Sequence, residues 1–146
     1  MKKRVSILLY LLCFLSMTSC SKQEAYSFMH DPETIVKIEI VHVGEKNYEK
    51  MEIEQDVLLT IEDKTSFLKA FADVPCYRVF TDPKSILSDS YAIKIIYDNG
   101  EYELIGCSGQ AKCSNNGKLN LDTGFRYFDE SAFNAFIANC LEGKMN

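Results

Sequence analysis

Apolar and polar residues alternate along several short stretches of the chain, which is the pattern of a β-strand with one buried face. In the clearest stretch, residues 91–97 place Tyr or Ile at every second position, and residues 102–104 resume the alternation with Tyr and Leu. Between them, Asp98-Asn99-Gly100 tolerates the positive φ angles of a tight hairpin turn. Further strands are predicted at 36–43, 48–53, 57–61, 76–80, 110–113, 119–121 and 125–128.

Two stretches instead carry apolar residues at helical spacing. The first covers residues 67–74 and follows Asp63, whose side chain can accept hydrogen bonds from the free N–H groups of a first helical turn. The second covers residues 133–141 and follows Asp129 in the same way. Together these elements predict an α+β domain, in which a mostly antiparallel β-sheet of about five to seven strands carries two amphipathic helices packed on it.

The first twenty residues have the parts of a secretory signal. Three basic residues follow Met1, an apolar run covers residues 5–15, and small residues precede Cys20. The apolar run is shorter than the roughly 20 residues that a permanent membrane-spanning helix needs. The segment therefore predicts export and removal of the N-terminus.

Met17-Thr18-Ser19-Cys20 resembles the lipobox of bacterial lipoproteins. The resemblance implies that diacylglycerol, with acyl chains such as palmitate, is attached to the Cys20 thiol and that signal peptidase II cuts before this residue. The lipid would then hold the protein on a membrane, facing the extracytoplasmic side. The alternatives are an ordinary cleavable signal with a cysteine near its end and a buried N-terminal helix.

The chain divides accordingly into three parts: residues 1–19 are the lipoprotein signal peptide, 20–33 the lipidated cysteine with a flexible tether, and 34–146 a single α+β domain. The tether is predicted because residues 21–33 are polar and have no periodicity. Tyr26, Phe28 and Met29 are its exceptions, and they are candidates to pack onto the domain.

The charge of the mature chain restricts its partners. Residues 1–19 contain three of the 16 basic residues and none of the 21 acidic ones, so their removal changes the net charge from −5 to −8. An acidic domain is repelled by phosphate backbones and anionic headgroups. We therefore expect no nucleic-acid partner, and we expect the lipid rather than the protein surface to supply membrane attachment.

Four cysteines remain after Cys13 is removed and Cys20 is lipidated. In an exported protein an even number favours disulfides, and the predicted pairs are Cys107–Cys113 and Cys76–Cys140. Free thiols are the alternative. The chain has two histidines and no Cys-x-x-Cys pair, so we expect no metal site and no cofactor besides the covalent diacylglycerol.

The sequence contains no catalytic signature that we recognise. His42 lies within a predicted strand, where a single polar partner is its ordinary role, and His30 lies in the predicted tether. Acidic residues 52, 54 and 56 would share one face of a strand, with Glu45 and Glu49 nearby. Such a row either faces solvent or binds a cation or a basic partner.

Aromatic residues and the only arginines of the mature chain concentrate on the central strands. Tyr and Arg are enriched at binding hot spots, but Tyr is also common in strands that merely pack. The candidate binding surface consists of Tyr77, Arg78, Tyr97, Tyr102, Arg126 and Tyr127, with Phe80, Tyr91 and Phe125 beside them.

The layout of residues 34–141 resembles that of small lipoproteins of Gram-positive bacteria, on three segments: 61–64 (IEDK), 91–100 (YAIKIIYDNG) and 124–129 (GFRYFD). The resemblance implies a fold and a Gram-positive plasma membrane, but no activity. The leading hypothesis is a non-enzymatic module at the cell envelope that binds a protein, a peptide or an envelope component. The alternatives are a small envelope-acting enzyme or ligand carrier, and an inhibitor or immunity-type protein.

Overall fold

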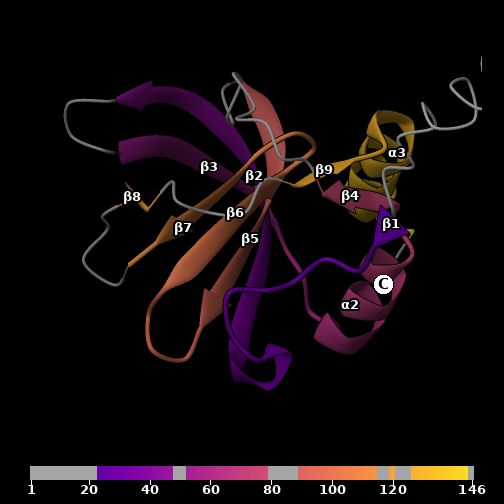
Figure 1. Ribbon diagram of the computed structural model, residues 1–146, viewed down its shortest axis with the longest axis horizontal. Helices are drawn as coiled ribbons and strands as arrows, with labels where there is room; N and C mark the ends of the chain where they lie inside the picture. The colour runs from indigo at the N-terminus through magenta and orange to yellow at the C-terminus, as the bar shows by residue number, and fades with distance from the viewer. Residues whose placement is uncertain (1–22, 48–51, 79–88, 115–118, 121–125, 145–146) are drawn as a thin grey trace, which may run out of the picture.

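The computed structural model describes residues 23–47, 52–78, 89–114, 119–120 and 126–144 (Figure 1). Within them the chain forms nine strands and two α-helices, and every strand pairing is antiparallel. The predicted α+β class is confirmed. The strands divide between two sheets, a division that the sequence did not indicate.

The larger sheet has the strand order β3-β2-β5-β6-β7-β8. Its strands are β2 (Ile35–Asn47), β3 (Glu52–Thr60), β5 (Ser90–Tyr97), β6 (Tyr102–Gly106), β7 (Gln110–Cys113) and β8 (Leu119–Asn120). The Asp-Asn-Gly hairpin joins β5 to β6 as predicted, with Ile96 opposite Tyr102 and Gly100 at a φ of 83°. Only glycine adopts this φ readily, which explains the turn sequence.

The smaller sheet has the order β1-β4-β9 and consists of β1 (Gln23–Glu24), β4 (Cys76–Arg78) and β9 (Arg126–Phe128). Its central strand follows helix α2 (Lys64–Ala72), and β9 leads into helix α3 (Glu130–Leu141). Both predicted N-caps are confirmed, because Asp63 accepts a hydrogen bond from the Ser66 N–H and Asp129 accepts one from the Ala132 N–H. The small sheet thereby fixes where α3 begins.

Both helices lie on the same side of the larger sheet (Figure 1). Phe67 and Phe71 of α2 meet Phe136 of α3, with ring centroids 5.2 and 5.5 Å apart respectively. These rings pack over the inward-facing isoleucines of β2, β5 and β6 and form the main hydrophobic core. Burial of this apolar surface is the principal stabilisation of the fold.

The opposite face of the larger sheet carries a second, smaller core around Val41, Ala92 and Leu104. Gln55 of β3 donates a hydrogen bond of 3.2 Å from its Nε2 to the Tyr102 hydroxyl of β6. Because β2 and β5 separate these two strands in the sheet, the contact shows that the sheet curls around this second core.

The segment from Gln23 to Thr34 belongs to the folded domain, which corrects the predicted flexible tether over its described residues, 23–33. Strand β1 pairs with β4, and Tyr26, Phe28 and Met29 pack against the main core. The packing of these three residues was expected, but the described part of the predicted tether, from Gln23 onward, is joined to the domain by strand pairing and by core contacts. The three apolar side chains add to the main core, where the Tyr26 and Phe28 rings both contact the Phe71 ring.

Cys20 and the predicted signal peptide lie outside the described residues. The same holds for parts of the strands predicted around residues 48–51, 79–80, 121 and 125. Among the described residues, no helix has the length and the apolar character required to cross a membrane.

Candidate binding cleft

The predicted binding surface does not exist as a single surface, because its six residues lie in three places. Tyr97 is 1% exposed and belongs to the main core. Tyr102 packs against the second core on the opposite face of the sheet. The four remaining residues lie on β4 and β9 of the small sheet. The sequence indicated which strands were aromatic but not which sheet, or which face, each strand would present.

Tyr77 and Tyr127 are directly opposed across β4 and β9. Their ring centroids are 5.3 Å apart and their planes differ by 27°, so the rings are stacked. Successive side chains of a strand point to opposite faces, so the buried neighbours Cys76 and Phe128 face the core while the two tyrosines face away from it. Both tyrosines are half-buried, which leaves part of each ring accessible.

The two arginines are also opposed in register, but they do not share the face of the stacked tyrosines. The Arg126 guanidinium carbon lies 5.9 Å from the centroid of the Tyr26 ring, on the core side of the small sheet. Gln110 holds the Arg126 backbone, because its amide donates to the Arg126 carbonyl at 2.7 Å and its Oε1 accepts from the Arg126 N–H at 3.2 Å. Arg126 therefore lies where the two sheets meet.

An open cleft of about 1220 Å³ lies beside the stacked tyrosines. One wall is Tyr77 and Tyr127, a second is helix α3 with Asn134 and Ile137 among its lining residues, and a third is the end of the larger sheet with His42 and Tyr91. This volume is above the usual range of small-molecule sites, which is roughly 300–1,000 Å³.

A polar pair marks the sheet wall of the cleft. His42 Nε2 lies 3.3 Å from Asp89 Oδ1, and the Tyr91 ring meets the imidazole edge-on at 5.8 Å. The expectation of one polar partner for His42 is confirmed. Asp89 has a φ of 48°, a conformation that side-chain-bearing residues other than Asn and Asp rarely adopt. No sequence pattern indicates a role for Asp89, because its contact with His42 depends on the pairing of β5 with β2, which places Tyr91 opposite His42.

The cleft is acidic. Its described lining contains the carboxylates of Asp89, Asp129, Glu130 and Glu142, and no lysine or arginine. The effect extends to Cys107, which also lines the cleft: burial, and then the negative charges of Glu130 and Asp129, raise the pKa of its thiol. The negative charges of Glu130 and Asp129 are therefore felt by the Cys107 thiol.

Cys107 and His42 both line the cleft but do not form a nucleophile–base pair. They lie on the β6 and β2 sides of the sheet, and strand β5 with Tyr91 stands between them. The Cys107 thiol donates instead to the Phe128 carbonyl at 3.7 Å. A nucleophile requires a base within roughly 3 Å and a low pKa, and this thiol has neither.

Neither predicted disulfide is formed, because Cys76, Cys107, Cys113 and Cys140 are free thiols in the structure. Cys113 pairs with Tyr102 at one end of the β6–β7 hairpin, while Cys107 lies at its turn, roughly 16 Å away at 3.3 Å per residue. A disulfide requires Cα atoms within about 7 Å.

The other predicted pair fails for a similar reason. The Asp129 N–H donates to the Pro75 carbonyl at 3.0 Å, which places the start of α3 beside Cys76. Cys140 lies about three turns, or roughly 16 Å, further along that helix. Both thiols face the same core without meeting.

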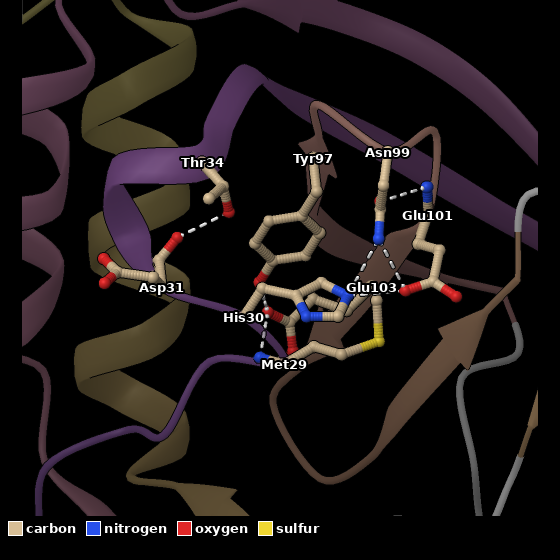
Figure 2. A network of polar contacts seen from close by, with 8 residues as sticks. All are labelled: Met29, His30, Asp31, Thr34, Tyr97, Asn99, Glu101 and Glu103. Atoms are coloured by element: carbon tan, nitrogen blue, oxygen red, sulfur yellow. Dashed lines mark hydrogen bonds and ion pairs between the residues drawn. The ribbon is translucent and has the colours of Figure 1, made fainter.

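A second polar cluster, formed by residues outside the cleft lining, fixes the N-terminal segment (Figure 2). The fully buried Glu103 carboxylate accepts hydrogen bonds from the Tyr26 hydroxyl at 2.8 Å, from the Met29 N–H at 3.1 Å and from the Tyr97 hydroxyl. Burial and the neighbouring Glu103 charge raise the pKa of both tyrosine hydroxyls. The cluster is a closed structural network rather than a ligand site.

His30 extends this cluster to the surface. Its Nε2 lies 2.5 Å from Glu101 Oε2, and its ring meets the Tyr97 ring edge-on at 4.8 Å. Asn99 also donates to Glu101, at 3.0 Å. These hydrogen bonds lower the pKa of the Glu101 carboxyl. His30 therefore helps to hold the N-terminal segment on the larger sheet and is not part of a flexible tether.

The predicted acidic row is described only in part. Glu54 and Asp56 are exposed on β3, an edge strand of the larger sheet. The side chains of residues 45, 49 and 52 lie outside the described part of the chain. Among the described residues, no group of three or more His, Cys, Asp or Glu side chains is arranged to hold a metal ion.

Comparison of the chain with protein-family models, with curated proteins and with solved structures gave no match.

Proposed function

We propose that this protein is an exported lipoprotein, held on the cell membrane through Cys20, and that it acts as a binding module at the cell envelope. The cleft between the small sheet and helix α3 is its binding site. One observation carries this proposal above the others: a stacked, half-exposed tyrosine pair forms the wall of an open cleft. Accessible aromatic rings beside a concavity are typical of protein and peptide recognition.

The fold supports a close association with the membrane. Strand β1 begins at Gln23, three residues after Cys20. Three residues span at most about 11 Å when fully extended. A domain anchored at Cys20 would therefore lie directly above the lipid headgroups, with limited freedom to reorient.

A small envelope-acting enzyme is the second candidate, and the His42–Asp89 pair in the cleft favours it. An imidazole held by a carboxylate is the arrangement of many general bases. His42→Gln separates the two functions, since it would abolish base catalysis but leave binding through the tyrosine wall largely unchanged.

Site-specific photocrosslinking in intact cells tests the binding function. A photoreactive benzoylphenylalanine is placed at the position of Tyr127 in the cleft, or at that of Val57, which is 53% exposed on β3 outside the cleft. We expect a discrete crosslinked species from the cleft position alone. Equal crosslinking at both positions, or none at position 127, would contradict a binding role for the cleft.

A further inference from the structure

We propose that the ligand of the cleft is a basic polypeptide segment, whose lysine or arginine side chains contact the stacked tyrosines and the surrounding carboxylates. This inference rests on the proposed function and names the chemistry of its partner.

The tyrosine wall is suited to a cation. The Tyr77–Tyr127 pair and the Tyr91 ring, which is 48% exposed, line the same cleft from two sides. The face of an aromatic ring attracts an ammonium or guanidinium group within about 6 Å. The chain already uses this interaction elsewhere, because Lys94 lies 4.6 Å from the centroid of the Tyr102 ring.

The charges around the wall have one sign. Asp89, Asp129 and Glu130 face the cleft without a described lysine or arginine among its lining residues. Glu142 contributes less, because it forms an ion pair with Lys144. The N-terminus of α3 adds a partial positive charge of about half a unit, which is smaller than the two carboxylates beside it. Asp89 also lies beside His42, and Asp129 accepts a hydrogen bond from the Ala132 N–H. A cationic ligand would therefore find the tyrosine rings beside an excess of negative charge.

The size of the cleft indicates a polypeptide rather than a small amine. A volume of about 1220 Å³ is larger than a single side chain or a small metabolite fills. A segment of several residues would cover the distance between the tyrosine wall and the His42 side while keeping its charged groups near the carboxylates. The net charge of −8 after removal of residues 1–19 would also steer a basic partner toward the domain.

The test uses the full-length protein purified in non-ionic detergent and a fluorescein-labelled octapeptide of alternating lysine and serine, with the glutamate–serine octapeptide as its counterpart. Fluorescence anisotropy gives the dissociation constants. Asp89→Asn with Glu130→Gln removes two cleft charges, and asparagine is among the residues that best tolerate the positive φ of Asp89. The matched control is Glu33→Gln with Glu62→Gln, because both residues are exposed and lie outside the cleft lining.

We expect the lysine peptide to bind and the glutamate peptide not to bind. The double cleft variant should weaken lysine-peptide binding by about tenfold, as expected for the loss of two partly exposed charge interactions, and the control should change it by less than about twofold. Raising the salt concentration from 50 to 500 mM should weaken binding to the unmodified protein without any substitution. This salt series keeps the test decisive even if a variant folds poorly.

Equal affinity for both peptides, or equal loss of affinity in the cleft and control variants, would overturn a basic ligand. Tighter binding of free lysine amide than of the peptide would replace the polypeptide with a small amine. The proposed function fails separately, through absent crosslinking at position 127. A crosslinked partner segment without lysine or arginine would leave the binding function intact and refute its basic chemistry.

Discussion

The Tyr26 hydroxyl donates a hydrogen bond of 2.8 Å to the buried carboxylate of Glu103, 77 residues further along the chain. The contact joins the N-terminal segment to the middle of the larger sheet. It matters because a fully buried carboxylate is tolerated only when donors satisfy it. The N-terminal segment supplies two of the three donors that Glu103 receives, and the fold therefore depends on residues just after the proposed anchor.

Tyr26→Phe should destabilise the domain by about 1–3 kcal/mol, because it leaves a buried carboxylate with one donor fewer. Urea unfolding of the variant and of the parent protein measures the difference. Ser27→Ala is the matched control, since Ser27 is exposed in the same segment and should change stability by less than about 0.5 kcal/mol. Equal stability of Tyr26→Phe and the parent would show that Glu103 does not depend on this hydroxyl.

Phe71→Ala should cost about 3–5 kcal/mol, the range for removing a large aromatic side chain from a packed core. Phe71 is 2% exposed and meets the rings of Tyr26, Phe128 and Phe136, so its loss opens a cavity where α2, α3 and the N-terminal segment converge. Thermal unfolding provides the measurement. Val57→Ala on the exposed edge strand serves for comparison, and a similar cost at both positions would argue against this arrangement of the core.

Local patterns predicted the elements well because the physics that forms them is local. Alternation around the Asp-Asn-Gly turn gave the β5–β6 hairpin, and Asp63 and Asp129 cap the helices as their spacing indicated. The same hairpin also contained an unused signal: its register places Glu103 directly opposite Ile95, which is fully buried. A carboxylate opposite a core isoleucine requires donors from another part of the chain, and that requirement pointed to a docked segment.

The candidate site was harder to predict because it depends on how strands are distributed between sheets. Tyr77 and Tyr127 were predicted as binding residues, and they do lie together beside a cleft. Tyr97 was grouped with them, yet it faces the main core. Nothing in the sequence reveals that β4 and β9 pair with each other instead of joining the larger sheet, since their paired residues are 48 to 52 positions apart.

Replacing Glu101 should reduce the acid sensitivity of the fold. Hydrogen bonds from His30 and Asn99 lower the pKa of the Glu101 carboxyl from its ordinary value of 4.5. A carboxyl with a lowered pKa in the folded state contributes stability above its unfolded pKa and loses that contribution as the pH falls through the folded value. Stability measured from pH 6 to pH 3 should therefore decline less steeply below about pH 4.5 in Glu101→Gln than in the parent.

Glu62→Gln is the control for this pH series, because Glu62 is an exposed carboxylate outside the cluster. Its profile should follow that of the parent protein. Identical profiles for Glu101→Gln and Glu62→Gln would show that the contacts with His30 and Asn99 have no energetic consequence.

We expect the four free thiols to differ in their reactivity toward a thiol reagent. In denaturant without reductant, all four cysteines of the described domain should react with a thiol reagent, because no disulfide joins them. In the folded protein, half-buried Cys107 should react first, whereas burial protects Cys76 and Cys140 and raises the pKa of each to about 11. Mass spectrometry counts the labels, and a mass lower by two or four hydrogens before labelling would reveal disulfides instead.

Cys20→Ala should leave an uncleaved precursor, because the proposed lipidation and cleavage both require the thiol. Radiolabelled palmitate should enter the parent protein and not the variant, and gel mobility should distinguish precursor from mature chain. The matched control is Cys13→Ala, which removes a cysteine from the apolar run and should be processed normally. Normal cleavage of Cys20→Ala with unchanged membrane retention would refute the anchor. The cleft would then remain a binding site, but the domain would no longer be confined to about 11 Å from the bilayer surface.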